Sequence, residues 1–196
     1  MIDSKLIAQL RAQTGAGIVD CKKALEEGNG DFTAAVEYLR KRGQKVAANK
    51  QERETKEGLV YANTHTNGRV GALVELLCET DFVARTDDFK QLAHDISLQI
   101  IAMNPLYVKA DDVPAEVIDK ELEIYKEQMG TTLAGKPQEM VDKIMQGKIA
   151  KYYEEACLIK QKFIKDDSMT IEDLITKSIG KIGENIQVKR FCRFSL

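Results

Sequence analysis

The sequence predicts an α+β fold, in which an N-terminal three-helix bundle precedes a core of helices that cover a three-stranded antiparallel sheet. Three observations point to this class. Glycine turns separate three short amphipathic segments near the N-terminus, an Asn-Gly pair joins two runs of strand-forming residues, and a third such run lies near the C-terminus. The chain has 196 residues, of which 43% are hydrophobic, so it can bury at least one ordinary core.

Residues 1–43 are predicted to form the three-helix domain. The turns between its helices are Thr14–Gly17 (TGAG) and Gly28–Asp31 (GNGD). Asp31 is a favourable N-cap for the third helix, in which apolar residues recur at helical spacing. The other two helices carry matching stripes, one of which runs from Ile18 through Cys21 to Leu25. A domain of about forty residues is near the lower limit for independent folding.

Residues 44–57 are predicted to form a charged linker or a solvated helical extension, because the apolar period is lost there and charges of both signs alternate. A basic cluster that begins at Arg40 raises the alternative of an RNA-binding surface. Glutamates follow it from Glu52 onwards and no aromatic residues are interleaved, so a solvated face is the favoured interpretation.

Residues 58–196 are predicted to form the α+β core domain. Leu59–Thr64 and Val70–Leu77 should pair as a hairpin around Asn67-Gly68, with positive φ at both turn residues. Ile186–Phe194 should form the third strand. One face of that strand is expected to carry Ile186, Val188, Cys192 and Phe194, and the other Gln187, Lys189 and Arg193.

The segment from Asp87 to Lys181 is predicted to be mostly helical. Its first helix places four apolar residues on one face, namely Phe89, Leu92, Ile96 and Ile100. A second helix is expected between Pro114 and Gly130, and a third opens at Pro137. The third carries Met140, Ile144, Ile149 and Tyr153 in loose helical register, as a core or partner-packing stripe.

The composition argues against most enzyme classes. The chain contains no phosphate-binding glycine loop, nucleophile elbow or zinc-binding helix motif. Its four cysteines are scattered and its two histidines lack partners at metal spacing, so we expect no disulfide framework, metal site or cofactor. The formal charge is −2 and no long apolar run occurs, which favours a cytoplasmic protein without a nucleic-acid or membrane partner. An enzyme with a Cys or His nucleophile stays a distant alternative.

The stretch ETDFVART, residues 79–86, allows two interpretations at the junction of the second strand and a helix. In the first, Thr80 or Asp81 caps the helix and Phe82 staples it to the core. In the second, Asp81 and Phe82 project from the surface and bind a partner. Residue types alone favour the cap and staple.

Two long motifs resemble the elongation factor Ts family, whose members are guanine-nucleotide exchange factors of translation. One is LRAQTGAGIVDCKKALEEGNGDFTAAVEYLRKRG at residues 10–43, and the other is ETDFVART. Further stretches such as IGENIQVKRFCRF follow in family order. The resemblance implies a bundle of ubiquitin-associated type, a protein that is not an enzyme, and elongation factor Tu as the partner.

The resemblance also implies two contact regions. Thr80, Asp81, Phe82 and Val83 would disturb the magnesium and phosphate site of the partner GTPase. Ile18, Val19, Lys22 and Lys23 would grip it through the N-terminal domain, although the family often has two methionines where Ile18 and Val19 stand. One of these two residues is expected to fill the bundle core instead.

The length resembles the short, single-core subclass of the family, in which two chains pair. The residue 58–196 domain would then carry the homodimer interface, with the C-terminal strand and the helix around Tyr152 as candidates. Cys192 lies on that strand and is expected to stay a free thiol. A helical RNA-binding or adaptor protein that uses the basic segment Arg40–Lys50 is the alternative from another functional class.

Overall fold

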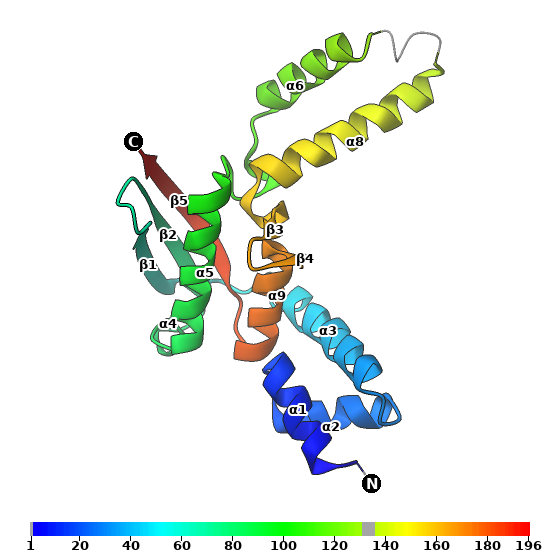
Figure 1. Ribbon diagram of the computed structural model, residues 1–196, viewed down its shortest axis with the longest axis vertical. Helices are drawn as coiled ribbons and strands as arrows, with labels where there is room; N and C mark the ends of the chain where they lie inside the picture. Colours follow the sequence, from blue (N-terminus) through cyan, green and yellow to red (C-terminus); the bar gives the residue numbers. More distant parts are fainter. Residues whose placement is uncertain (1, 131–135) are drawn as a thin grey trace. The chain divides into compact units, whose positions relative to one another are not determined.

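The computed structural model describes residues 2–130 and 136–196 and has an α+β fold (Figure 1). The chain divides into two compact units. The first takes the chain up to Tyr61 together with Val74–His94 and Asp173–Lys189, and the second takes Ala62–Leu73, Asp95–Glu172 and Arg190–Leu196. The three-part division at residues 1–43, 44–57 and 58–196 stays a prediction.

The N-terminal segment forms three helices, as the glycine turns predict. They are α1 (Ser4–Thr14), α2 (Ile18–Glu27) and α3 (Phe32–Ala48). Asp31 caps α3, because its carboxylate accepts a hydrogen bond from the N–H of Ala34 at 2.7 Å. The helices enclose a small core of fully buried residues, which are Leu10, Cys21, Ala24, Leu25 and Ala35.

Helix α3 continues to Ala48, so the first part of the predicted linker is helical. Arg42 in this stretch pairs with Asp20 at 2.8 Å, and both side chains are partly exposed. This ion pair connects one member of the basic cluster to α2 of the bundle.

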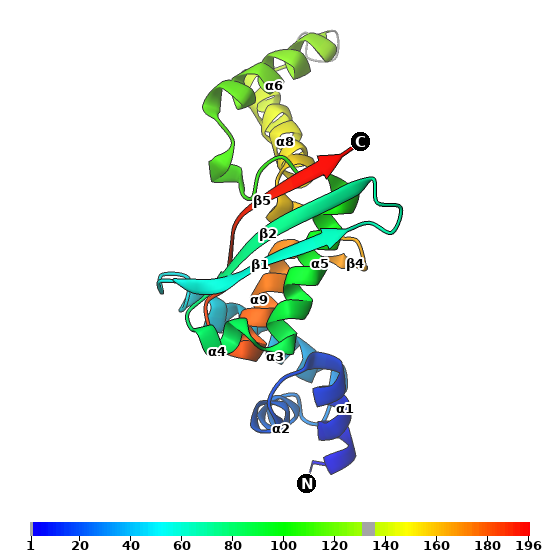
Figure 2. The same cartoon turned by 90° about the vertical axis from the view of Figure 1, so that its left-hand side faces the viewer.

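The three-stranded sheet has the order β1-β2-β5, where β1 is Glu57–Thr64, β2 is Val70–Cys78 and β5 is Gln187–Ser195 (Figure 2). Figure 2 shows β5 running beside β2 in the opposite direction. The predicted third strand is therefore confirmed. In the first unit, α9 (Ile171–Ile182) and the first turns of α5 (Asp87–Met103) lie on one face of the sheet (Figures 1 and 2).

The turn between β1 and β2 differs from the predicted one. Gly68 has a positive φ of 68°, whereas Asn67 does not, so the prediction of positive φ at both residues is wrong. The N–H of Gly68 donates to the carbonyl of His65 at 2.8 Å, and the N–H of His65 donates to Val70. The loop is thus longer than two residues, and within it only Gly68 adopts the left-handed region, which glycine reaches without strain.

The face of β5 predicted to carry Ile186, Val188, Cys192 and Phe194 becomes more exposed toward the end of the strand. Ile186 is buried and Val188 is half-buried, but Phe194 is 70% exposed. The side-chain alternation of a strand predicts which residues share a face, not whether that face is covered along its full length. The uncovered end of the strand therefore carries an exposed aromatic ring.

The helices of the middle segment agree with their predicted limits. α5 buries the predicted face, since Phe89, Leu92, Ile96 and Ile100 are nearly inaccessible to solvent. α6 spans Ala115–Gln128 and α8 spans Gln138–Ala156, each directly after a proline. On the expected stripe of α8, Met140 is exposed whereas Ile144, Ile149 and Tyr153 are half-buried, so its role as a core or partner-packing surface stays a prediction.

A small second sheet was not predicted. It pairs β3 (Lys162–Phe163) with β4 (Asp166–Thr170), in antiparallel fashion. The buried side chain of Gln99 on α5 supports it, since Nε2 of Gln99 donates to the carbonyl of Lys162 at 3.0 Å and Oε1 accepts from the N–H of Ile164 at 2.9 Å. A two-residue strand is too short to leave a period in the sequence.

The short 3-10 turns Ala110–Asp112 and Leu158–Lys160 complete the described elements, together with α4 at Asp81–Ala84. None of the described helices is long and apolar enough to cross a membrane. Among residues 2–130 and 136–196, no group of three or more His, Cys, Asp or Glu side chains could hold a metal ion.

Candidate functional site

The stretch ETDFVART forms a tight corner between β2 and α5. β2 ends at Cys78, Thr80 has extended backbone angles, and α4 begins at Asp81. The Oγ1 atom of Thr80 accepts a hydrogen bond from the N–H of Val83 at 3.4 Å. Thr80 is therefore the helix cap, as one interpretation of the sequence proposed.

Phe82 does not staple α4 to the core, because 79% of its surface is exposed. The inner side of α4 is instead formed by Ala84, which is buried, and Val83, which is half-buried. The expectation of a staple is wrong, since a four-residue helix buries only one side and Phe82 lies on the other. An aromatic ring thus projects from the corner into solvent.

Asp81 lies beside Phe82 and pairs with Arg85 at 2.7 Å. Both side chains are substantially exposed, and such pairs one helical turn apart contribute little to stability in water. The carboxylate of Asp81 can therefore exchange its partner for another donor at low cost.

Glu184, in the segment between α9 and β5, fixes the other side of the corner. Its Oε2 accepts hydrogen bonds from the backbone N–H groups of Glu79 at 3.1 Å and Thr80 at 3.0 Å. Its Oε1 accepts from the hydroxyl of Thr80 at 2.7 Å. Bonds to an ionised acceptor are stronger than neutral ones, so this carboxylate holds the end of β2 firmly.

The thiol of Cys78 lies under the same corner. It donates to the carbonyl of Thr80 at 3.2 Å and is fully buried. Burial, and then the nearby carboxylate of Glu184, raise the pKa of Cys78 to about 11. Cys78 is accordingly a packed, protonated thiol rather than a nucleophile, and all four cysteines are free.

The second predicted contact region lies at the start of α2. Ile18 and Val19 are 56% and 79% exposed, and Lys22 and Lys23 are exposed one turn later. The expectation that one of the two apolar residues fills the core is wrong, because Cys21 and the residues one turn beyond it already close the bundle. Two apolar side chains and two cations therefore share an accessible surface.

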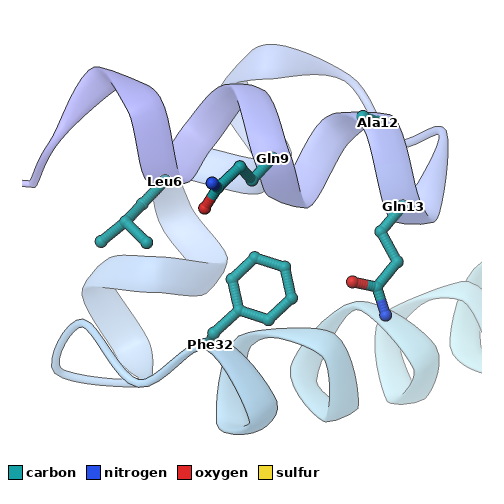
Figure 3. A pocket seen from close by; sticks show the side chains of 5 residues that line it. All are labelled: Leu6, Gln9, Ala12, Gln13 and Phe32. Atoms are coloured by element: carbon teal, nitrogen blue, oxygen red, sulfur yellow. The ribbon is translucent and has the colours of Figure 1, made fainter.

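The N-terminal bundle also has a shallow pocket that the sequence did not indicate (Figure 3). Its lining residues come from α1 and the start of α3. They are Leu6, Gln9, Ala12, Gln13 and Phe32. Figure 3 shows side chains of α1 pointing toward the ring of Phe32. No charged group lines it, and its polar lining consists of the amides of Gln9 and Gln13.

Comparison with known proteins identifies the family. The family described as "Elongation factor TS" matches residues 5–194. The chain belongs to the elongation factor Ts family. It is 54% identical to "Elongation factor Ts" of Thermotoga maritima over 195 residues, which cover 100% of this chain and 96% of the relative.

Two other relatives carry the same name. The protein from Fervidobacterium nodosum is 52% identical, with 100% of this chain and 98% of the relative covered. The protein from Carboxydothermus hydrogenoformans is 51% identical, with 100% and 89% covered. The family match includes both the bundle motif and the corner at residues 79–86. The resemblance inferred from those motifs is confirmed, whereas the individual roles of Thr80 to Val83 and of Ile18 to Lys23 stay predictions.

Proposed function

We propose that this family member is a guanine-nucleotide exchange factor that binds elongation factor Tu in its GDP form and promotes release of GDP, so that GTP can bind. The observation that supports the proposal best is the exposed ring of Phe82 on a corner held by the charged hydrogen bonds of Glu184. Because 79% of its surface is exposed, Phe82 contributes little to the core of the free protein. It is the kind of rigid aromatic anchor that dominates protein interfaces.

The proposed mechanism follows from how a GTPase holds its nucleotide. Phosphate contacts and a magnesium ion that bridges phosphate oxygens to protein ligands provide most of the binding. A ring inserted beside these elements displaces the side chains that support the metal, and the whole site weakens. Phe82 loses little side-chain entropy on insertion, since it has few rotatable bonds.

Asp81 would complete the insertion. Its carboxylate forms an exposed pair with Arg85, so it can accept hydrogen bonds from donors that the displacement uncovers.

The start of α2 would supply affinity rather than distortion. Ile18 and Val19 would dock as an apolar anchor on a helix of the GTPase, and the ammonium groups of Lys22 and Lys23 would steer the approach. Because binding linkage is reciprocal, the factor and GDP must weaken each other's affinity by the same amount. Incoming GTP then ejects the factor, and no covalent bond changes at any step.

Two copies of the chain would pair in a homodimer. The exposed Phe194 near the end of β5 and the exposed Leu196 beyond it support an interface at this strand. Sedimentation of Phe194→Asp tests the pairing, since a charge on a buried interface should give monomers. We further propose that the protein acts in the cytoplasm without a cofactor and without direct nucleic-acid or membrane partners.

The test of the exchange function is release of a fluorescent GDP from purified elongation factor Tu, with and without this protein. Acceleration by the wild type, and its loss in Asp81→Ala and Phe82→Ala at matched occupancy of the complex, would support the proposal. Leu106→Ala is the matched control, because Leu106 is a comparably exposed apolar residue outside both contact regions. A folded wild type that does not accelerate release would overturn the proposal.

A further inference from the structure

The corner that carries Phe82 is held by residues far away in the sequence. Glu184 reaches Thr80 across 104 positions and engages both its backbone N–H and its hydroxyl. The same carboxylate also binds the N–H of Glu79. Three donors therefore converge on one side chain, and they include the residue that caps α4.

A return contact closes this arrangement. The Oε1 atom of Glu79 accepts from the backbone N–H of Asn185 at 2.6 Å. Asn185 is buried, and its Nδ2 donates to the carbonyl of Arg53 at 2.8 Å and to that of Gln51 at 3.4 Å. Each of the two glutamates thus binds backbone of the other's segment, and the amide of Asn185 attaches both to the chain that enters β1.

We propose that Glu184 is a positioning residue for nucleotide exchange, which acts through Thr80 to hold Phe82 in the orientation that enters the GTPase. The inference rests on the proposed exchange function and deepens it. Helix α4 has only four residues, too few for a helix to maintain its own geometry in water. Its direction is set by its cap, and the cap is set by Glu184.

The chemistry of the site favours positioning over general stability. Phe82 itself is 79% exposed, so contacts of its own ring cannot fix its direction. Preorganisation of a binding group lowers the ordering cost at the moment of contact, and misplacement by about 1 Å can cost a large factor in rate. Without Glu184 the ring stays on the surface, but the backbone that aims it is released.

A graded set of variants separates the contributions. Glu184→Ala removes all three hydrogen bonds to the corner, whereas Thr80→Val removes the hydroxyl and leaves both backbone bonds. Glu184→Gln keeps one oxygen for the two N–H groups, and its amide can donate to the hydroxyl oxygen of Thr80. Gln99→Ala is the control, because it deletes a buried polar network of similar size in the second unit.

The experiment measures GDP release from elongation factor Tu over a range of factor concentrations, for each variant and for the same variants combined with Phe82→Ala. We expect Glu184→Ala to lower the rate at saturation about tenfold, with Glu184→Gln close to the wild type and Thr80→Val between them. The half-saturating concentration should change much less. With Phe82→Ala already present, Glu184→Ala should have no further effect beyond about twofold, because both act through one ring.

The outcomes distinguish the two proposals. If Phe82→Ala exchanges like the wild type, the proposed exchange mechanism fails, and the positioning role fails with it. If Phe82→Ala is impaired while Glu184→Ala is not, exchange by Phe82 stands and positioning by Glu184 is wrong. Equal losses from Glu184→Ala with and without Phe82, or an equal loss in Gln99→Ala, would show a purely structural role and overturn the inference. Should Glu184→Ala not fold, Glu184→Gln and Thr80→Val carry the same comparison.

Discussion

The corner at α4 and the start of α2 each present an apolar side chain with the same exposed fraction, in very different settings. Phe82 and Val19 are each 79% exposed. The corner is attached by Glu184 to a segment more than a hundred residues away. The start of α2 follows Gly17, and no side chain caps it. Exposure shows where a partner can make contact. The hydrogen bonds that fix the backbone show whether that contact can displace side chains of the partner.

This difference assigns the two regions different tasks. A braced aromatic ring can displace the partner's side chains without yielding, because its own backbone is fixed by charged hydrogen bonds. The start of α2 has no side-chain cap, and its apolar residues contribute mainly to affinity. The predictions below separate the two tasks by following the rate at saturation and the half-saturating concentration independently.

The largest effect is expected for Phe82→Ala. Removal of the ring should lower the saturated rate of GDP release by roughly thirtyfold, as expected for loss of a central aromatic anchor. The half-saturating concentration should stay within about threefold, because the α2 contact remains. Fluorescent GDP release across factor concentrations measures both values. An unchanged saturated rate would remove the distinction between the two regions.

A smaller effect is expected for Val19→Asp, and it should fall on the half-saturating concentration rather than on the saturated rate. A carboxylate buried without a partner at an interface is costly, so the half-saturating concentration should rise about tenfold while the saturated rate is kept. Val19→Met is the control, because methionine is apolar and flexible and should bind at least as well. A reduced saturated rate in Val19→Asp would indicate that α2 also takes part in the distortion.

Removal of the N-cap of α3 tests whether partner binding by the start of α2 depends on the stability of the three-helix bundle. Asp31→Ala removes the hydrogen bond to the N–H of Ala34 and should lower the free energy of unfolding by about 1 kcal/mol. Asp31→Asn should retain most of that amount, because its amide oxygen also accepts. Urea unfolding followed by circular dichroism measures the change. The rate of GDP release per folded molecule should stay the same. A lower rate per folded molecule would indicate that the bundle orients the corner at residues 79–86.

The smallest effect is expected for Arg85→Ala. The pair between Arg85 and Asp81 is exposed, so its loss should change the exchange rate by less than about twofold. The same release assay measures it, with Lys165→Ala as a control for loss of another surface cation. A drop as large as that of Phe82→Ala would show that Asp81 needs its intramolecular partner to act.

Local chemistry made much of the fold predictable. The limits of α2 and α3 follow from glycine turns and from the cap at Asp31, and the apolar face of α5 follows from its helical period. The turn at Asn67 was mispredicted, because a pair of residues does not specify the length of the loop around it. The strands β3 and β4 were missed, because a buried glutamine on α5 organises them.

The position of the candidate site in the sequence was predictable, but the arrangement of its side chains was not. Residue types alone favoured a buried Phe82, and only the fold shows that Ala84 takes the inner position. The role of Glu184 left no local signal, since a carboxylate that binds backbone across 104 positions has no fixed spacing. The exposure of both Ile18 and Val19 depends on how the three helices close, which the period of α2 alone does not determine.

The most direct test of the central claim is the coupling between this protein and GDP on elongation factor Tu. The affinity of the GTPase for GDP is measured with and without the bound factor, and the affinity for the factor is measured with and without GDP. The account predicts equal mutual weakening for the wild type, nearly complete loss of this coupling in Phe82→Ala, and retention of it in Val19→Asp despite weaker binding. Full coupling in Phe82→Ala would contradict the account.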